Sequence, residues 1–172
     1  MNTVAEETEV IKKKNDHLEH LLSKAEAGER GKSLRDKTPR TVHASWQASP
    51  GRNDPVAILI ETSKGREEHL IPIRYGRMLK SPFAFYRGAA AIMAADLATT
   101  PSTGIYVQSC GDCHLMNFGS YATPERRIAF DINDFDETHP APWEWDVKRL
   151  ATSFVIAAIN NGLDQSEAKE IA

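Results

Sequence analysis

The residues best suited to chemistry lie in two short stretches in the second half of the chain. Residues 110–119 read CGDCHLMNFG and directly follow a strand-like run. Residues 130–137 read FDINDFDE, a strand-like run that ends in acids. A turn between the two stretches would let them return antiparallel, which would bring an Asp, an Asn and a second Asp close enough to share a metal ion. The pattern indicates part of a phosphoryl-transfer site.

Phosphoryl transfer requires from a protein mainly positioning and the neutralisation of charge. It needs a carboxylate that accepts the proton of the attacking hydroxyl, and oxygen ligands for Mg²⁺. Asp112 can serve as the base while the amide oxygen of Asn117, five residues on, reaches the metal. Asp134 is the preferred second ligand because it follows the apolar face of a strand and precedes an aromatic residue. Asp131 and Asp136 compete with it for this role.

Three segments resemble those of aminoglycoside phosphotransferases and related small-molecule kinases. Residues 111–117, Gly-Asp-Cys-His-Leu-Met-Asn, are similar to their catalytic loop, which reads roughly Gly-Asp-x-His-x-x-Asn. The His that opens that loop is replaced here by Cys110. Residues 132–136 look like the metal-binding segment, an apolar strand ending in Asp and an aromatic residue. Residues 142–151 are similar to the Pro-x-x-x-Asp-Leu-Ala segment, whose Asp opens a helix and braces the loop.

The resemblance implies a role for each matching residue. It makes Asp112 the catalytic base and His114 the residue that orients the catalytic loop. It makes Asn117 and Asp134 ligands of Mg²⁺, and it makes Asp146 a structural brace. The expected cofactors are therefore Mg²⁺ and ATP, with an unknown small molecule or protein as the substrate.

A longer pattern resembles a bacterial family catalogued as domain of unknown function 2252. It covers about residues 38–172 and includes Arg-Tyr-Gly-Arg-Met at 74–78, Ser-Pro-Phe at 81–83 and Trp-Glu-Trp-Asp at 143–146. The resemblance implies a kinase-like fold and names no substrate. Members of the family are much longer, with a glycine-rich stretch and a lysine-containing strand after this region. Such an order is permuted relative to ordinary kinases.

The chain departs from the pattern of a complete kinase. It contains no glycine-rich phosphate loop and no strand lysine paired with a helix glutamate, since Lys64 and Lys80 stand in the wrong contexts. A helix that begins at Gln165 has room for only one or two turns and gains little stability. We therefore expect residues 38–172 to be the N-terminal portion of a truncated kinase-like domain, inactive on its own. The alternative is a catalytically inactive kinase-like module that binds a nucleotide or a protein.

Three arginines precede residues 110–119, which we call the polar loop; they are Arg74, Arg77 and Arg87. The planar fork of arginine suits phosphate. We therefore assign the three arginines as candidates for binding the cofactor's phosphates. The alternative is that they form ion pairs with the acids of residues 131–146.

The two cysteines allow two further interpretations. Residues 110–114 spell Cys-x-x-Cys-His, the attachment pattern of c-type haem. Covalent haem attachment is typical of exported proteins, however, and the first 22 residues lack the apolar core of a secretion signal. A zinc site from Cys110, Cys113, His114 and His139 is possible by residue type, although the adjacent Cys113 and His114 form an awkward chelate.

Composition limits the class of protein. The 172 residues are 41% hydrophobic and 26% charged, which is enough for one domain with a core. The net charge of −3 argues against a dedicated nucleic-acid binder. No apolar run approaches the roughly 20 residues that a membrane span needs. We expect a cytoplasmic protein.

Hydrophobic periodicity predicts an α+β fold, mostly helical, with a small β-hairpin that carries the site. The expected organisation is a polar N-terminal helix and linker over residues 1–37, followed by the kinase-like domain over residues 38–172. The predicted helices span residues 5–27, 55–63, 83–97 and 143–160, with another from Gln165. The predicted strands span residues 69–73, 104–109 and 127–133. The predicted irregular segments are residues 28–53, a basic turn at 74–78 and a rigid connection at 139–142.

Overall fold

The computed structural model describes residues 22–171 and divides the chain into two compact units, Met1–Val42 and His43–Ala172. In the first unit, helix α2 (Lys24–Lys37) begins at Ser23 with a capping box that Glu26 completes. The predicted helix at residues 5–27 lies mostly outside the described residues. The prediction of an irregular segment from residue 28 is wrong as far as Lys37, because a glycine inside a helix costs only about 1 kcal/mol and Gly28 does not end α2.

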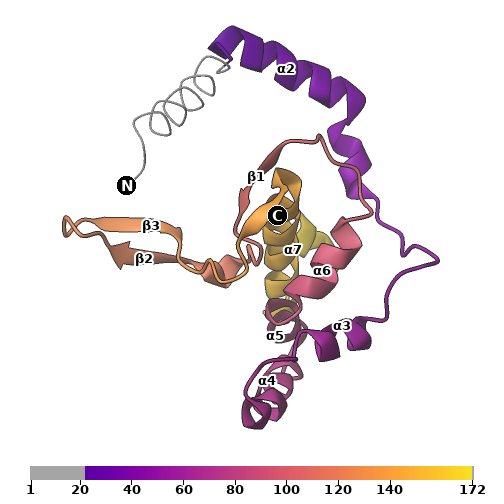
Figure 1. Cartoon of the computed structure of the whole chain (residues 1–172), viewed down its shortest axis with the longest axis vertical. Helices are drawn as coiled ribbons and strands as arrows, with labels where there is room; N and C mark the ends of the chain where they lie inside the picture. The colour runs from indigo at the N-terminus through magenta and orange to yellow at the C-terminus, as the bar shows by residue number, and fades with distance from the viewer. Residues whose placement is uncertain (1–21, 172) are drawn as a thin grey trace, which may run out of the picture. The chain divides into compact units, whose positions relative to one another are not determined.

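The second unit contains most of the secondary structure (Figure 1). Helix α7 contacts α5, α6, α8, β1 and η3, so it is the element against which the others pack. The α-helices of this unit are α3 (Pro55–Glu61), α4 (Ile71–Met78), α5 (Pro82–Arg87), α6 (Ala90–Leu97), α7 (Trp143–Asn160) and α8 (Gln165–Ile171). The 3₁₀ helices are η1 (Arg40–Ala44), which crosses the boundary between the units, η2 (Glu68–Leu70) and η3 (Leu115–Asn117).

The strands form two separate antiparallel pairs, β1 (Tyr106–Ser109) with β4 (His139–Pro142) and β2 (Phe118–Ala122) with β3 (Ile128–Ile132). The predicted rigid connection at residues 139–142 is therefore wrong. Trp143 N–H donates to the Ile105 carbonyl, which places Pro140 and Pro142 at the non-hydrogen-bonded positions of the ladder. A proline there removes no hydrogen bond, so the segment can pair as a strand.

Two predicted elements of the first half are also wrong. Residues 69–73 form no strand and residues 74–78 no turn, because Pro72 stands in the first turn of α4, where a proline is tolerated. The single helix predicted for residues 83–97 is interrupted at Gly88. A Cβ at Gly88 would lie 2.6 Å from the sulfur of Met78, so α5 ends where the backbone passes close to the last residue of α4.

Other helices agree with the sequence. Helix α7 has the predicted bounds, and it ends in a Schellman motif in which Gly162, at φ +96°, and Leu163 donate to the Ile159 and Ala158 carbonyls. Helix α8 begins after Asp164, which exchanges hydrogen bonds with Glu167 as a capping box. The α+β class is confirmed.

The interior of the second unit is unusually polar. The buried apolar residues are mostly small, and the buried polar residues are Ser63, Ser109, Asp112, His114, Asn117, Glu144, Arg149 and Ser153. The hairpin β2–β3 is open by contrast, because Ile128 and Phe130 on one face of β3 are 84% and 70% exposed. The buried centre of the unit therefore coincides with the polar loop rather than with the hairpin. Within residues 22–171 no helix has both the length and the apolar character needed to cross a membrane.

Candidate functional site

The polar loop after β1 is fixed by the first turn of α7. The Asp146 carboxylate accepts hydrogen bonds from the backbone N–H groups of Cys110, at 2.7 Å, and Gly111, at 3.2 Å. Gly111 has φ +83°, and a Cβ at this position would lie 2.1 Å from the Glu137 carbonyl oxygen. The loop thus fits closely between α7 and the acidic segment of residues 131–137, and the Asp146 carboxylate holds its backbone.

The carboxylate of Asp112 is paired with Arg149, which no sequence pattern assigned. Arg149 is 2% exposed, and its Nε donates to Asp112 Oδ1 at 2.7 Å while its Nη2 contacts the same oxygen. Burial raises the pKa of the Asp112 carboxyl above its usual value, and the charge of Arg149 opposes that rise. Helical spacing could have indicated this contact, because Arg149 stands three residues after Asp146 and shares its helix face.

His114 is a neutral residue that fixes the turn of the loop. Its Nδ1 accepts a hydrogen bond from Met116 N–H at 3.2 Å, which leaves the ring proton on Nε2. Nε2 lies 3.5 Å from Asp112 Oδ2. Burial, followed by the charges of Arg149 and Arg87, lowers the pKa of His114 to about 4. His114 is therefore uncharged near pH 7 and directs an N–H toward the Asp112 carboxylate.

Asn117 is the second polar residue that the loop buries. Its Nδ2 donates to the Asp112 carbonyl oxygen at 2.8 Å, and no described residue donates to its amide oxygen. Its own carbonyl accepts from Asn133 N–H at 2.9 Å, which brings the acidic segment beside the loop. Asn117 therefore keeps an oxygen ligand available next to Asp134.

A cavity of about 540 Å³ collects most of the predicted site residues. One part of its lining is acidic and polar, and another part is basic. The acidic and polar part consists of Asp112, His114, Asn117 and Asp134, and the basic part of Arg66, Arg74, Arg77 and Arg87. Asp146 braces the loop outside this cavity. Neither Asp131 nor Asp136 lines it, so Asp134 is the one of the three competing acids that does.

The arginines of the cavity form no ion pair with a carboxylate of residues 22–171. Arg74 Nη2 donates to the Gly88 carbonyl at 2.8 Å, but Arg74 Nη1 is buried and has no hydrogen-bond partner among residues 22–171. None of Arg74, Arg77 and Arg87 forms an ion pair with a described carboxylate, so the alternative of ion pairs with residues 131–146 is not realised. The cavity offers positive charge to an anion.

The carboxylates around Glu137 repel one another. Burial raises the pKa of Glu137, and the charges of Asp112, Asp134 and Asp136 raise it further. A divalent cation would relieve such crowding. The oxygen donors of Asn117 and Asp134 fit Mg²⁺, which commonly takes one or two protein ligands and keeps several waters.

The alternative metal and haem sites find no support in the geometry. Within the described part of the chain, no group of three or more His, Cys, Asp or Glu side chains could hold a metal ion, so the zinc site is not assembled. Cys110 and Cys113 are buried, and burial raises the pKa of the Cys113 thiol to about 12. Neither thiol is accessible for covalent attachment of haem.

Residues 66–172 match the model of a protein family described as "Uncharacterized protein conserved in bacteria" (DUF2252). The chain belongs to the DUF2252 family. The family match begins at residue 66 rather than at the predicted residue 38. It includes every residue that lines the cavity described above, from Arg66 to Asp134, together with Arg149. No curated protein matches the chain, and no solved structure does.

Proposed function

We propose that this DUF2252 domain is a Mg²⁺- and ATP-dependent phosphotransferase whose substrate is unidentified. The observation that carries the proposal is the cavity in which unpaired arginines share the lining with Asp112, Asn117 and Asp134. Positive charge for phosphate oxygens, oxygen ligands for Mg²⁺ and a carboxylate base are the three things that phosphoryl transfer requires.

Each residue has a defined role in this proposal. Asn117 and Asp134 hold the metal through side-chain oxygens, and Mg²⁺, when bound, neutralises charge on the transferred phosphoryl group. Asp112 accepts the proton of the substrate hydroxyl at Oδ2, the oxygen that Arg149 leaves free. The raised pKa of Asp112 strengthens it as a base near neutral pH. The guanidinium of Arg74 binds a phosphate oxygen through its unpartnered Nη1.

We further infer a kinase-like arrangement for the domain. Support comes from the spacing of Asp112 and Asn117 on one loop, from Asp134 directly after a hairpin and from Asp146 bracing the loop at the start of a helix. These are the positions that the motifs of small-molecule kinases imply.

A second candidate function is a nucleotide-binding module without catalysis. The observation that favours it is the buried pair between Asp112 and Arg149. A guanidinium held against the carboxylate stabilises its charged form and so opposes proton transfer.

Turnover decides between the two functions. The complete gene product, whether or not it extends beyond residue 172, is assayed for Mg²⁺-dependent ADP release from ATP. Asp112→Asn should lower turnover by about 100-fold or more, the usual contribution of a general base. Asn117→Ala should raise the Mg²⁺ concentration needed for half-maximal activity. Asp131→Asn is the matched control, because Asp131 is an exposed carboxylate on β3 that does not line the cavity.

Phosphate binding is measured separately with Mg²⁺-tripolyphosphate and the 172-residue chain. Arg74→Met should weaken binding, and Arg127→Met, which removes an exposed arginine outside the cavity, should not. Nucleotide binding without turnover, unaffected by Asp112→Asn, would support the inactive module. Equal effects of the variants and their controls would exclude both functions.

A further inference from the structure

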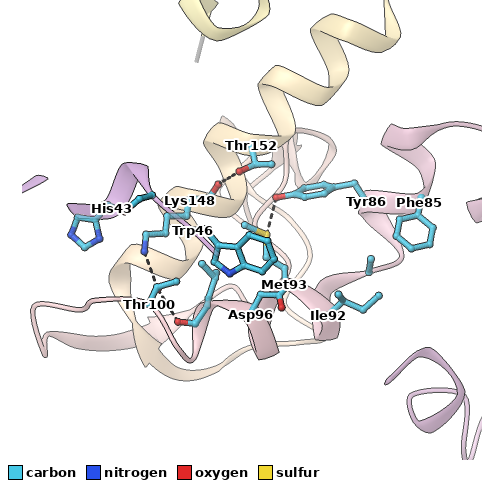
Figure 2. A pocket seen from close by; sticks show the side chains of 13 residues that line it. His43, Trp46, Phe85, Tyr86, Ile92, Met93, Asp96, Thr100, Lys148 and Thr152 are labelled. Atoms are coloured by element: carbon cyan, nitrogen blue, oxygen red, sulfur yellow. Dashed lines mark hydrogen bonds between the residues drawn. The ribbon is translucent and has the colours of Figure 1, made fainter. Parts of the chain in front are cut away.

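A second cavity lies behind the buried pair, lined by residues 43–46 and by α5, α6 and α7 (Figure 2). It encloses about 410 Å³, a volume typical of small-molecule sites. Its lining is mainly apolar and is formed by Trp46, Phe85, Ala89, Ile92, Met93 and Leu97. The proposed phosphoryl transfer makes no use of this cavity.

The indole of Trp46 is held in place although it is 48% exposed. The Arg52 guanidinium stacks over it at 5.5 Å from the ring centroid and donates to both carboxylate oxygens of Asp96, at 2.6 and 2.9 Å. Asp96 also lines the cavity, and this pairing neutralises its charge. An apolar ligand would therefore gain an aromatic surface without facing an unpaired carboxylate.

Lys148 brings an unpaired cation to the cavity. Its ammonium donates to Thr100 Oγ1 at 3.0 Å and forms no ion pair with any described carboxylate. The nearest acid on the same helix is Glu144, whose Oε1 is occupied by the backbone N–H and the hydroxyl of Thr103 at 2.7 and 2.6 Å. Burial lowers the pKa of Lys148. The charge of Glu144 opposes this lowering without forming an ion pair, so a closer anion would stabilise the ammonium further.

His43 brings a second polar group to the cavity. Its Nδ1 is buried and has no hydrogen bond within residues 22–171. The Glu144 carboxylate interacts electrostatically with both His43 and Lys148. Figure 2 shows the side chains of His43 and Lys148 on the same side of the cavity. The hydroxyls of Thr100 and Thr152 already donate to backbone carbonyls. One ammonium and one imidazole nitrogen match a head group with a single negative charge.

We propose that this cavity binds a small carboxylate with an apolar body. The carboxylate pairs with Lys148 and meets the imidazole of His43, while the body lies against Trp46, Ile92 and Leu97. This site is separate from the proposed phosphoryl-transfer cavity and needs neither Mg²⁺ nor ATP.

The test compares two probes of nearly identical shape, 4-phenylbutyrate and the uncharged 4-phenylbutanol, by calorimetry and by Trp fluorescence with the 172-residue chain. The acid should bind about tenfold tighter than the alcohol, which corresponds to about 1.4 kcal/mol. Lys148→Met should abolish that preference and leave the affinity for the alcohol unchanged. Lys80→Met is the matched control, because Lys80 is an exposed lysine outside the cavity.

A variant that fills the space tests the location. Ala89 is buried in the lining, and Ala89→Leu should weaken the binding of both probes. Equal affinities of the acid and the alcohol for the wild-type chain would overturn the proposal without relying on any variant. Failure of both probes to bind, or binding that Ala89→Leu does not change, would overturn it as well.

Discussion

Lys148 and Arg149 are neighbours on α7, but their charged groups lie in different surroundings, because Lys148 lines the apolar cavity and Arg149 is buried against Asp112. Arg149 is fully buried and bonded to the Asp112 carboxylate and to the Tyr86 carbonyl at 2.9 Å. Lys148 is half-buried, and its ammonium bonds only to a hydroxyl. The fold thus supplies an ion-pair partner for Arg149, whereas Lys148 has none among the described residues.

Tyr86 separates the two environments. Its ring lies 4.4 Å from the Arg149 guanidinium carbon and its hydroxyl donates to the Arg149 carbonyl at 2.8 Å, while the side chain also lines the apolar cavity. Burial raises the pKa of the Tyr86 hydroxyl to about 12, so it remains a donor at any physiological pH. Asp112, Arg149 and Tyr86 therefore form a fixed network of hydrogen bonds, whereas the ammonium of Lys148 can accept a further partner.

The largest effect should come from breaking the fixed network. Arg149→Met should lower the free energy of unfolding by about 3–5 kcal/mol, because it leaves a buried carboxylate without its partner. Chemical denaturation measures the loss. The double variant Arg149→Met with Asp112→Asn should recover much of it, since both charges are then absent. A loss below about 1 kcal/mol in the single variant would show that the pair is not the centre of the fold.

Local signals in the sequence were sufficient for several elements. Asp54 before Pro55, Asp164 before α8 and Asn161-Gly162 after α7 each place a helix end through contacts within a few residues. The hairpin likewise brings the acidic segment beside the loop because only a short turn separates β2 from β3. The convergence of Asp112, Asn117 and Asp134 on one cavity follows from such short-range connections.

Features that depend on distant contacts were not accessible in this way. Gly88, at the break between α5 and α6, approaches the side chain of Met78, and nothing in the local sequence indicates that contact. The partner of Arg149 lies 37 positions away in the chain, and the only local indication of the contact is the helical spacing of Arg149 from Asp146.

A change of pH should affect the fixed network next. The pKa of His114 is about 4 in the folded protein, below the usual 6.5 of histidine, so the unfolded chain binds more protons between these values. The contribution of His114 is complete above about pH 6.5 and is lost as the pH falls toward 4. The loss amounts to about 3 kcal/mol. In His114→Gln, the free energy of unfolding should depend less on pH across this window, and equal slopes for both proteins would contradict the assignment.

The smallest effect should come from Lys148→Met, although it removes a full charge one residue from Arg149. Methionine keeps the apolar stem and removes an ammonium that burial destabilises. The free energy of unfolding, measured by the same denaturation, should stay within about 0.5 kcal/mol of wild type or rise. A loss comparable to that of Arg149→Met would mean that Lys148 has a partner within the fold, and the contrast between the two side chains would then disappear. An unchanged or higher stability would mean that the charge of Lys148 contributes nothing to the folded chain alone, as expected for a group whose partner is a ligand.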